Sequence, residues 1–241
     1  MDNYQAVFKR KEIKYLLTEE KLTAMMPAIK AHMEPDEFAH SSISNLYYDT
    51  PDFRMVRRSM EKPQYKEKLR LRSYSSPKEC SKVFPEIKKK AEGIVYKRRV
   101  CMEYEEATEY LHGKSRSPSG QIFRELDWIL SSYNSLAPRV FLSYERDSWK
   151  GKEDSNLRLT LDRDILWRTV ALDLREEKWG EKLLRQGQVL MEIKAANAVP
   201  VWLAHLLSNN NIFPVSFSKY GRAFEGIYKE NIRLKETGYN A

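Results

Sequence analysis

The segment QYKEKLRLRSY, residues 64–74, decides the fold, because basic and apolar side chains alternate in it one by one. Successive side chains of a β-strand point to opposite faces, so this alternation predicts a strand with one charged face and one apolar face. Leu69 and Leu71 lie on the apolar face. The charged face carries Lys66, Lys68, Arg70 and Arg72.

The same alternation recurs in short runs along the chain, and turn residues such as Asp49-Thr50-Pro51-Asp52 separate these runs. Many short alternating runs of this kind are typical of antiparallel sheets. Further strands are predicted at residues 8–16, 42–48, 83–90, 93–101, 139–149, 157–165 and 189–195.

Helical spacing of apolar residues appears between these runs. Thr18 is a suitable N-cap, with Glu19 and Glu20 in the first turn, and we expect that helix to reach about residue 33 and to be kinked or divided at Pro27. Further helices are predicted at residues 122–135, 200–209 and 218–232. Residues 113–120 are expected to form a mobile loop, and residues 173–186 fit either an excursion between strands or a helix.

Strands with one charged and one apolar face allow two arrangements. The apolar faces can fill a small barrel with the charges outside, or helices can cover the apolar faces while the charges line a lumen. The amphipathic helices favour the second arrangement, because they need an apolar surface on which to pack. The predicted fold class is therefore α+β, and we expect one domain over residues 1–241, since no linker marks a boundary.

Composition limits the function. The 241 residues include 42 Lys+Arg and 34 Asp+Glu, giving a net charge of +8 that favours an anionic partner. The common glycine-rich nucleotide motifs are missing, and two cysteines are too few for a disulfide framework. We find no apolar run long enough to span a membrane and no signal peptide, so a cytoplasmic location is expected.

A lumen lined only by cations would repel itself, by roughly 3 kcal/mol for two charges about 6 Å apart at an effective dielectric of about 20. Some counter-charge is available from Glu12, Glu86, Asp162 and Glu192, and a bound polyanion would supply the rest. Each basic run taken singly also fits a solvated outer face. Repetition in at least six runs favours a shared binding surface. RNA-binding sheets expose aromatic residues on the charged face, whereas Tyr15, Tyr96 and Tyr104 mostly fall with apolar partners here.

Eight motifs follow one another along the chain, namely RKEIKYLL (10–17), NLYYDTPDF (45–53), EKPQYKEKLRLRSY (61–74), VFPEIKKKAEGIVYKRR (83–99), SYERDSW (143–149), LRLTLD (157–162), LMEIK (190–194) and FSKYGRA (217–223). In this order they resemble the VTC domain of polyphosphate polymerases, within the triphosphate tunnel metalloenzymes. The resemblance extends from about residue 8 to residue 226 and implies a closed antiparallel tunnel of about eight strands flanked by helices.

The resemblance also implies roles for individual residues. Tunnel-lining catalytic cations would be Lys14, Arg70, Arg72, Lys88, Arg146, Arg158 and Lys219. Further substrate-binding or lining residues would be Arg10, Lys68, Glu86, Lys90, Lys97, Arg99, Tyr144, Thr160, Lys194 and Ser218. Glu192 would bind Mn²⁺ or Mg²⁺, with Glu12 and Asp162 as further candidate ligands. The wider superfamily has Glu-x-Glu-x-Lys on the first strand, and Arg10 replaces the first of these acids here.

The implied function is a metal-dependent polyphosphate polymerase that transfers the γ-phosphate of ATP to a growing polyphosphate chain. A triphosphatase acting on inorganic or nucleoside triphosphate in the same tunnel is the alternative within the site. A non-catalytic polyanion-binding module is the alternative of a different class. The expected ligands are ATP and polyphosphate or triphosphate, without nucleic acid or a membrane span, and the oligomeric state stays open.

Overall fold

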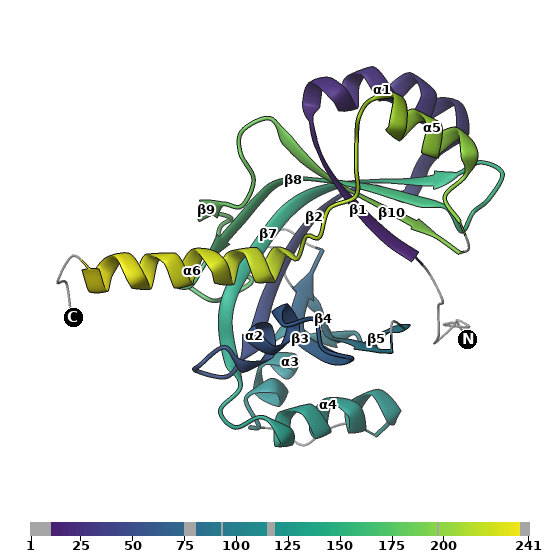
Figure 1. Cartoon of the computed structure of the whole chain (residues 1–241). Coiled ribbons are helices and arrows are strands. Elements are labelled where there is room, and N and C mark those ends of the chain that lie inside the picture. The colour runs from purple at the N-terminus through teal and green to yellow at the C-terminus, as the bar shows by residue number, and fades with distance from the viewer. Residues whose placement is uncertain (1–10, 75–80, 93, 115–118, 197, 237–241) are drawn as a thin grey trace.

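The computed structural model describes residues 11–74, 81–92, 94–114, 119–196 and 198–236. Arg10, the expected first residues of the strand at 8–16, and residues 115–118 of the expected loop at 113–120 lie outside the described residues. The described part contains ten strands and six helices (Figure 1). None of its helices is both long and apolar enough to cross a membrane.

The strands form one strongly bent antiparallel sheet, in which eight of them follow the order β1-β10-β8-β7-β2-β3-β4-β5 (Figure 1). Two short strands lie off this path, since β6 pairs with β4 and β9 pairs with β8. The bounds are β1 Lys11–Thr18, β2 Met33–Asp49, β3 Tyr65–Ser73, β4 Lys82–Ala91, β5 Ile94–Arg99, β6 Met102–Glu103, β7 Ala137–Gly151, β8 Arg158–Arg168, β9 Glu181–Lys182 and β10 Gln188–Ala195.

The expected closed, eight-stranded tunnel needs a correction. In the described part of the chain the sheet has ten strands, and no backbone pairing joins β1 to β5, the two ends of its path. The two sides approach through side chains instead: Nζ of Lys88 on β4 lies 2.9 Å from Oε2 of Glu12 on β1. An ion pair between side chains therefore stands where a closed barrel would have a ladder of backbone hydrogen bonds.

The helices are α1 Glu19–His32, α2 Arg54–Met60, α3 Tyr104–Leu111, α4 Gln121–Ser132, α5 Val201–Asn209 and α6 Lys219–Glu236. The predicted cap of α1 is confirmed, because Oγ1 of Thr18 accepts a hydrogen bond from the amide of Lys21. The helix contains Pro27 but is not divided there. The predictions at 122–135, 200–209 and 218–232 correspond to α4, α5 and α6.

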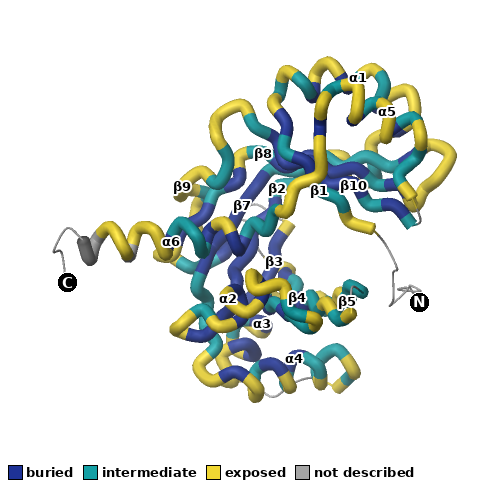
Figure 2. Tube along the Cα trace, in the orientation of Figure 1, coloured by how far each residue is buried: buried dark blue, intermediate teal, exposed yellow. Residues whose placement is uncertain are grey.

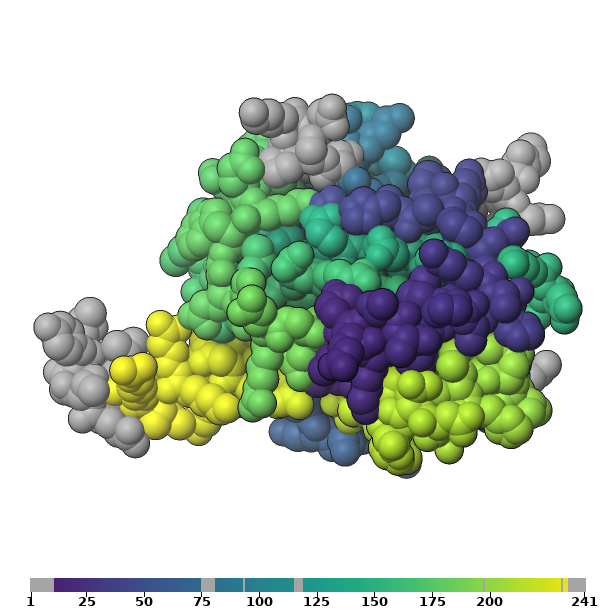
Figure 3. Space-filling view, turned by 90° about the horizontal axis from the view of Figure 1, so that it is seen from above, coloured from purple at the N-terminus to yellow at the C-terminus, as the bar shows by residue number. Residues whose placement is uncertain are grey.

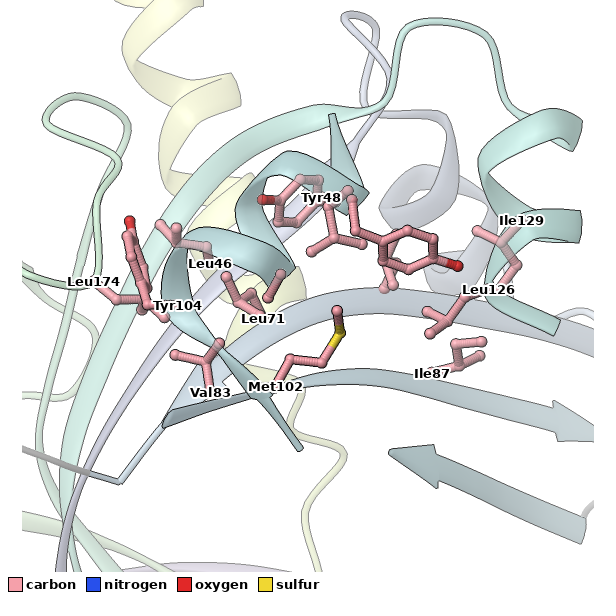
Figure 4. Close-up of a cluster of buried hydrophobic side chains, with 14 of the residues drawn as sticks. Leu46, Tyr48, Leu71, Val83, Ile87, Met102, Tyr104, Leu126, Ile129 and Leu174 are labelled. Carbon is pink, nitrogen blue, oxygen red and sulfur yellow. The ribbon is translucent and has the colours of Figure 1, made fainter. Parts of the chain in front are cut away.

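Helices cover the apolar outer faces of the sheet, as the sequence predicts. On one side, Leu69, Leu71 and Ile87 are completely buried against α3 and α4 (Figure 4). On the other side, Leu159 and Ile193 belong to a second cluster beneath α1 and α5. Figure 3 shows α1 and α5 side by side, and their contact includes stacked rings of His32 and Trp202 with centroids 4.3 Å apart.

A third apolar cluster lies on the concave face of the sheet, which the lumen hypothesis assigned to charges alone. Leu142 and Leu190 pack there against Tyr220 and Ala223 of α6. The concave face is therefore divided into a charged part and an apolar part that α6 covers. The second half of α6 extends beyond the sheet (Figure 2). Two of its large apolar side chains are exposed there, Tyr228 at 59% and Ile232 at 39%.

Several elements were not predicted. The long strand β2 begins at residue 33 rather than 42, and its first half is mostly exposed. The helix α2 follows the turn at 49–52, where Asp49 is completely buried. Its carboxylate accepts hydrogen bonds from the amides of Met55 and Val56 and from the hydroxyl of Tyr220. Asp49 thus caps α2 and joins it to α6, a contact that spans 171 positions of sequence.

The ambiguous segment at 173–186 is an excursion of turns with the two-residue strand β9. The guanidinium of Arg168 holds this excursion by donating to the carbonyls of Ala171, Glu177 and Trp179. It also lies 3.6 Å from the ring centroid of Phe141. Hydrogen bonds from one buried arginine therefore hold this segment, and neither strand nor helix periodicity in the sequence indicates them.

Candidate functional site

The charged part of the concave face opens into a cavity of about 910 Å³. Parts of β1, β3, β4, β5 and α6 line it, together with residues 214–218 that precede α6. Its lining contains eight basic residues against three acidic ones, Glu12, Glu67 and Glu225. The basic residues are Lys11, Lys14, Lys62, Lys66, Lys68, Lys88, Lys90 and Arg222. The cavity therefore offers a strong excess of positive charge.

One group of charges surrounds Glu86 on β4. Nε and Nη2 of Arg70 lie 2.8 and 2.6 Å from its Oε2, and Nζ of Lys97 lies 2.9 Å from its Oε1. Arg72 is 3.7 Å away and also donates to Asn45. Burial opposes ionisation of Glu86, but the three cations outweigh burial and hold its pKa far below the usual range. Glu86 thus serves as an internal counter-charge that fixes both arginines.

A second group surrounds Asp162 on β8. Its two oxygens accept from Nε and Nη2 of Arg146 at 2.6 and 2.8 Å, a bidentate pair. Lys219, the first residue of α6, donates to the same carboxylate. Burial would raise the pKa of Asp162, but Lys219 and Arg146 lower it to about 2. Both cations also lie over the ring of Tyr144, with Nζ of Lys219 4.5 Å from its centroid.

A third group lies on β1 and β10, which pair so that acids and lysines alternate. Lys14 lies opposite Glu192, and Glu12 lies opposite Lys194. Glu192 is 2.9 Å from Nζ of Lys194 and 3.7 Å from Nζ of Lys14. Burial opposes ionisation of Glu192, but Lys194 and Lys14 dominate and lower its pKa well below the usual range. Both glutamates are therefore ionised at neutral pH.

The other predicted residues are more spread out. Lys68 reaches the segment before α6, where its Nζ donates to Oγ of Ser218 at 2.9 Å. Arg158 pairs with Asp36 of β2, and its Nε has no hydrogen-bond partner among the described residues. Thr160 lies opposite Glu192 on the neighbouring strand, and its buried Oγ1 also lacks a partner in the described part of the chain.

Two further predicted residues, Lys90 and Arg99, lie on β4 and β5. Lys90 lines the cavity and is exposed. The guanidinium of Arg99 lies 5.2 Å from the ring centroid of Phe84. The strand residues of the predicted site thus share one face of the sheet. Arg158 lies opposite Lys194 on that face and also pairs with Asp36.

The sequence interpretation missed Tyr47. Its ring stacks on Tyr220 with centroids 4.4 Å apart, and its hydroxyl accepts from Nη1 of Arg70. Burial opposes ionisation of Tyr47, but Arg70 and neighbouring cations outweigh it and lower its pKa to about 8. Asn45 accepts a hydrogen bond from Arg72 and therefore lies on the charged face. Because Tyr47 is two residues further along the same strand, the alternation of side chains places it on that face as well.

Burial and crowding of like charges lower the pKa values of two lysines on this face. Burial and the nearby Lys14, Lys88 and Lys66 lower the pKa of Lys68 to about 8. Burial, together with Arg72 and Arg70, lowers the pKa of Lys97 to about 7 despite its pairing with Glu86. These two lysines lose their protons at a lower pH than an ordinary lysine. A bound anion favours the protonated form of each lysine, so binding of an anion would raise both pKa values and would be electrostatically favourable.

A solved structure shares this fold. It is a protein of Bacillus halodurans described as a candidate adenylate cyclase, with a TM-score of 0.56 and 17% identity over 87% of this chain and 95% of that chain. Another, PH1819 of Pyrococcus horikoshii OT3, has a TM-score of 0.44 and 13% identity over 90% of this chain and 99% of that chain. No curated protein matches the sequence. The family model of the VTC domain matches residues 9–228, nearly the whole chain. The chain therefore belongs to the VTC domain family.

Proposed function

We propose that this protein transfers the γ-phosphate of ATP onto a polyphosphate chain bound in the cavity. The observation that carries this proposal is the charged concave face, where Glu86 and Asp162 hold Arg70 and Arg146 on the face of the sheet that also carries lysines of the cavity lining. Phosphoryl transfer needs positioning and charge neutralisation more than covalent chemistry from the protein. A surface of fixed guanidinium groups supplies both.

The arginines are preorganised for phosphate. The side chain of Arg70 is 17% exposed and that of Arg146 is 15% exposed, so each is held by its carboxylate while part of the side chain stays accessible. A planar guanidinium suits phosphate oxygens, and its orientation needs no rearrangement when the ligand arrives. Lys14, Lys88 and Lys219 add compact charges around the same space.

The carboxylates fit a hard divalent cation shared with the substrate. Within the described residues, no three His, Cys, Asp or Glu side chains lie close enough to hold an ion by themselves. Mg²⁺ is commonly held by one or two carboxylates together with substrate phosphates, and Glu192 and Glu12 on adjacent strands match that donor set. The unpartnered Oγ1 of Thr160 next to Glu192 is a further oxygen for an ion or its water.

Glu192 and Glu12 are the proposed ligands, because each has only one oxygen within 3 Å of a lysine, whereas both oxygens of Asp162 accept hydrogen bonds from Arg146 or Lys219. A bound Mg²⁺ or Mn²⁺ would neutralise phosphate oxygens during transfer. The attacking oxygen belongs to the terminal phosphate of the acceptor and is already ionised near neutral pH, so no strong general base is needed. Accordingly, none of the four histidines belongs to the described lining of the cavity.

Hydrolysis by water in the same cavity is the competing activity, and product analysis separates the two. Incubation with ATP and Mn²⁺ or Mg²⁺, followed by polyacrylamide electrophoresis, should give a ladder of long anions. Formation of ADP and orthophosphate alone would overturn the polymerase proposal in favour of a triphosphatase.

Glu192→Gln tests catalysis against simple polyanion binding. A carboxylate beside phosphate is repulsive unless a cation bridges them, so this variant should lose turnover by roughly a hundredfold or more while keeping its affinity for triphosphate. Glu153→Gln, on the exposed turn after β7, is the matched control and should leave turnover unchanged. Undiminished turnover in Glu192→Gln would refute the metal role.

A further inference from the structure

Arg70 lies in the middle of a row of side chains that crosses three strands on the concave face of the sheet. On β2, Tyr47 lies directly opposite Arg70, and on β4, Glu86 lies directly opposite it from the other side. Side chains that face each other across neighbouring strands are close enough to interact. The row therefore places a phenol on one side of the guanidinium and a carboxylate on the other.

Glu86 alone does not fix the direction of this guanidinium. Nε and Nη2 of Arg70 both donate to the same atom, Oε2 of Glu86, at 2.8 and 2.6 Å. A guanidinium that is bound to a single acceptor atom can turn about that atom, because no second point is fixed. Arg146 differs, since its Nε and Nη2 donate to the two separate oxygens of Asp162. Arg70 thus needs another contact to be held in one orientation.

Tyr47 supplies this second contact. Its hydroxyl oxygen accepts a hydrogen bond from Nη1 of Arg70 at 3.2 Å. The ring of Tyr47 is itself held in place, because it stacks on the ring of Tyr220 with centroids 4.4 Å apart and 19° between the ring planes. The hydroxyl of Tyr220 in turn donates to the buried carboxylate of Asp49 at 2.8 Å. The packing of α6 therefore fixes Tyr47, and Tyr47 fixes Arg70.

The remaining donors of Arg70 suit a phosphate group. Nη1 and Nη2 each carry two N–H groups, and each uses one of them, on Tyr47 or on Glu86. The other N–H group on each of these nitrogens has no acceptor among the described residues. A bidentate contact with phosphate requires two such N–H groups, and it depends on their orientation.

We propose that Tyr47 is a positioning residue, which holds the guanidinium of Arg70 in the orientation that receives a phosphate group of the substrate. This inference rests on the proposed function and adds to it a residue of β2 that acts through Arg70 rather than on the phosphate. Tyr47 is only 6% exposed, which agrees with an indirect role. A phenylalanine at this position would keep the stacked ring and remove the acceptor.

The test is a double-mutant cycle of Tyr47→Phe and Arg70→Lys, in which calorimetric titration measures the affinity for inorganic triphosphate. Tyr47→Phe alone should weaken binding about threefold to tenfold, the range expected for one hydrogen bond. Arg70→Lys keeps a positive charge beside Glu86 but replaces the planar fork with a compact charge that has no plane to orient. In that background, Tyr47→Phe should change the affinity by less than about twofold.

The matched control is Tyr228→Phe, which removes the same atom from an exposed tyrosine and should bind triphosphate as the unmodified protein does. In turnover of ATP, Tyr47→Phe should lower kcat more than it raises KM, because orientation of the guanidinium matters most in the transition state.

The pH dependence is a readout that a purely structural role would not change. Burial opposes ionisation of Tyr47, but Arg70, Lys68 and Arg72 of β3 outweigh it and lower its pKa to about 8. Ionisation adds a negative charge beside the guanidinium, so triphosphate affinity should fall more steeply between about pH 7 and 9 in the unmodified protein than in Tyr47→Phe. Tyr220 of α6 does not titrate in this range, because burial and its carboxylate partner raise its pKa well above the usual value.

The other outcomes are decisive as well. Unchanged triphosphate affinity in Tyr47→Phe would overturn the positioning role while leaving the proposed function intact. Equal weakening in both backgrounds would also overturn it, because the loss would then come from packing and not through Arg70. A Tyr47→Phe protein that thermal denaturation shows to be unfolded at the assay temperature would assign the residue to folding instead. Failure of the unmodified protein to bind triphosphate would remove the proposed function itself.

Discussion

Nζ of Lys88 and Oε2 of Glu12 lie 2.9 Å apart, joining β4 to β1 on the side where no backbone pairing between β1 and β5 closes the described sheet. Both side chains are partly exposed, so the pair is open to solvent and salt. The charged cavity is thus bounded on this side by an ion pair between side chains rather than by a ladder of hydrogen bonds.

A double-mutant cycle with Lys88→Met and Glu12→Gln should therefore give a small coupling free energy, between about 0.2 and 1 kcal/mol in low salt. The coupling should fall toward zero in about 1 M salt, where the Debye length is about 3 Å. Urea denaturation of the four proteins measures it. A coupling above about 3 kcal/mol that resists salt would show that the two sides are held by more than this pair.

Anion binding should weaken as Lys97 loses its proton. Burial and neighbouring arginines lower its pKa to about 7, so its charge disappears as the pH rises through that value. In Lys97→Arg the guanidinium stays charged, and the fall in affinity for triphosphate between about pH 6 and 8 should become shallower. Calorimetric titration over this range measures the slope, and identical slopes in both proteins would contradict the assignment.

The same lowered pKa has the opposite effect on stability without ligand. Between about pH 7 and the ordinary lysine pKa of 10.5, the unfolded chain binds more protons at this position than the folded chain. The contribution of Lys97 to the free energy of unfolding should therefore rise with pH across that window. Lys97→Met removes the titration and should flatten the profile obtained by urea denaturation.

Asp49 should be essential for the junction of α2 and α6. Asp49→Ala leaves the buried amides of Met55 and Val56 and the hydroxyl of Tyr220 without their acceptor. We expect the free energy of unfolding to fall by roughly 3 kcal/mol or more, since hydrogen bonds to charged groups are strong and buried donors are costly to leave unpaired.

Two variants bracket the effect of Asp49. Tyr220→Phe removes one of these hydrogen bonds and should cost about 1 kcal/mol. Asp154→Ala, on an exposed turn, should change the free energy of unfolding by less than about 1 kcal/mol. Equal losses of unfolding free energy in Asp49→Ala and Asp154→Ala would show that the hydrogen bonds of Asp49 do not stabilise the contact between α2 and α6.

Gly226 allows α6 to approach β8 closely. A Cβ added there would lie 2.6 Å from Cζ2 of Trp167, too close for any real contact. Gly226→Ala should therefore destabilise the protein by about 1 kcal/mol or more, because overpacking outweighs the gain in helix propensity. Lys229→Ala, an exposed position on the same helix, is the control. Thermal denaturation measures both, and a higher melting temperature for Gly226→Ala would refute this packing.

Much of the site could be predicted from alternation alone. Because side chains in a strand alternate strictly, Lys68, Arg70 and Arg72 had to share one face, with Leu69 and Leu71 on the other. Facing strands then place Glu86 opposite Arg70 by register. The family resemblance named these same positions, and the structure brings them together on the concave face.

Other features depend on contacts between distant segments. Local sequence shows neither that Asp49 accepts from Tyr220 nor that Arg168 holds the excursion before β9, because partners far apart in sequence leave no periodic pattern. The helix α3 was not predicted, although its buried residues Tyr104, Ala107 and Tyr110 have helical spacing. It is only eight residues long and begins soon after a predicted strand, so the helical pattern is short.

The sequence by itself determined which residues are charged neighbours on each strand, since that depends only on the period of the backbone. Only the tertiary structure decided which face of the sheet is concave and that α6 fills part of it. It also decided which cations meet a carboxylate and which, like Lys66, do not. These properties depend on contacts between strands and helices that are distant in sequence, and such contacts leave no periodic pattern in any local run of residues.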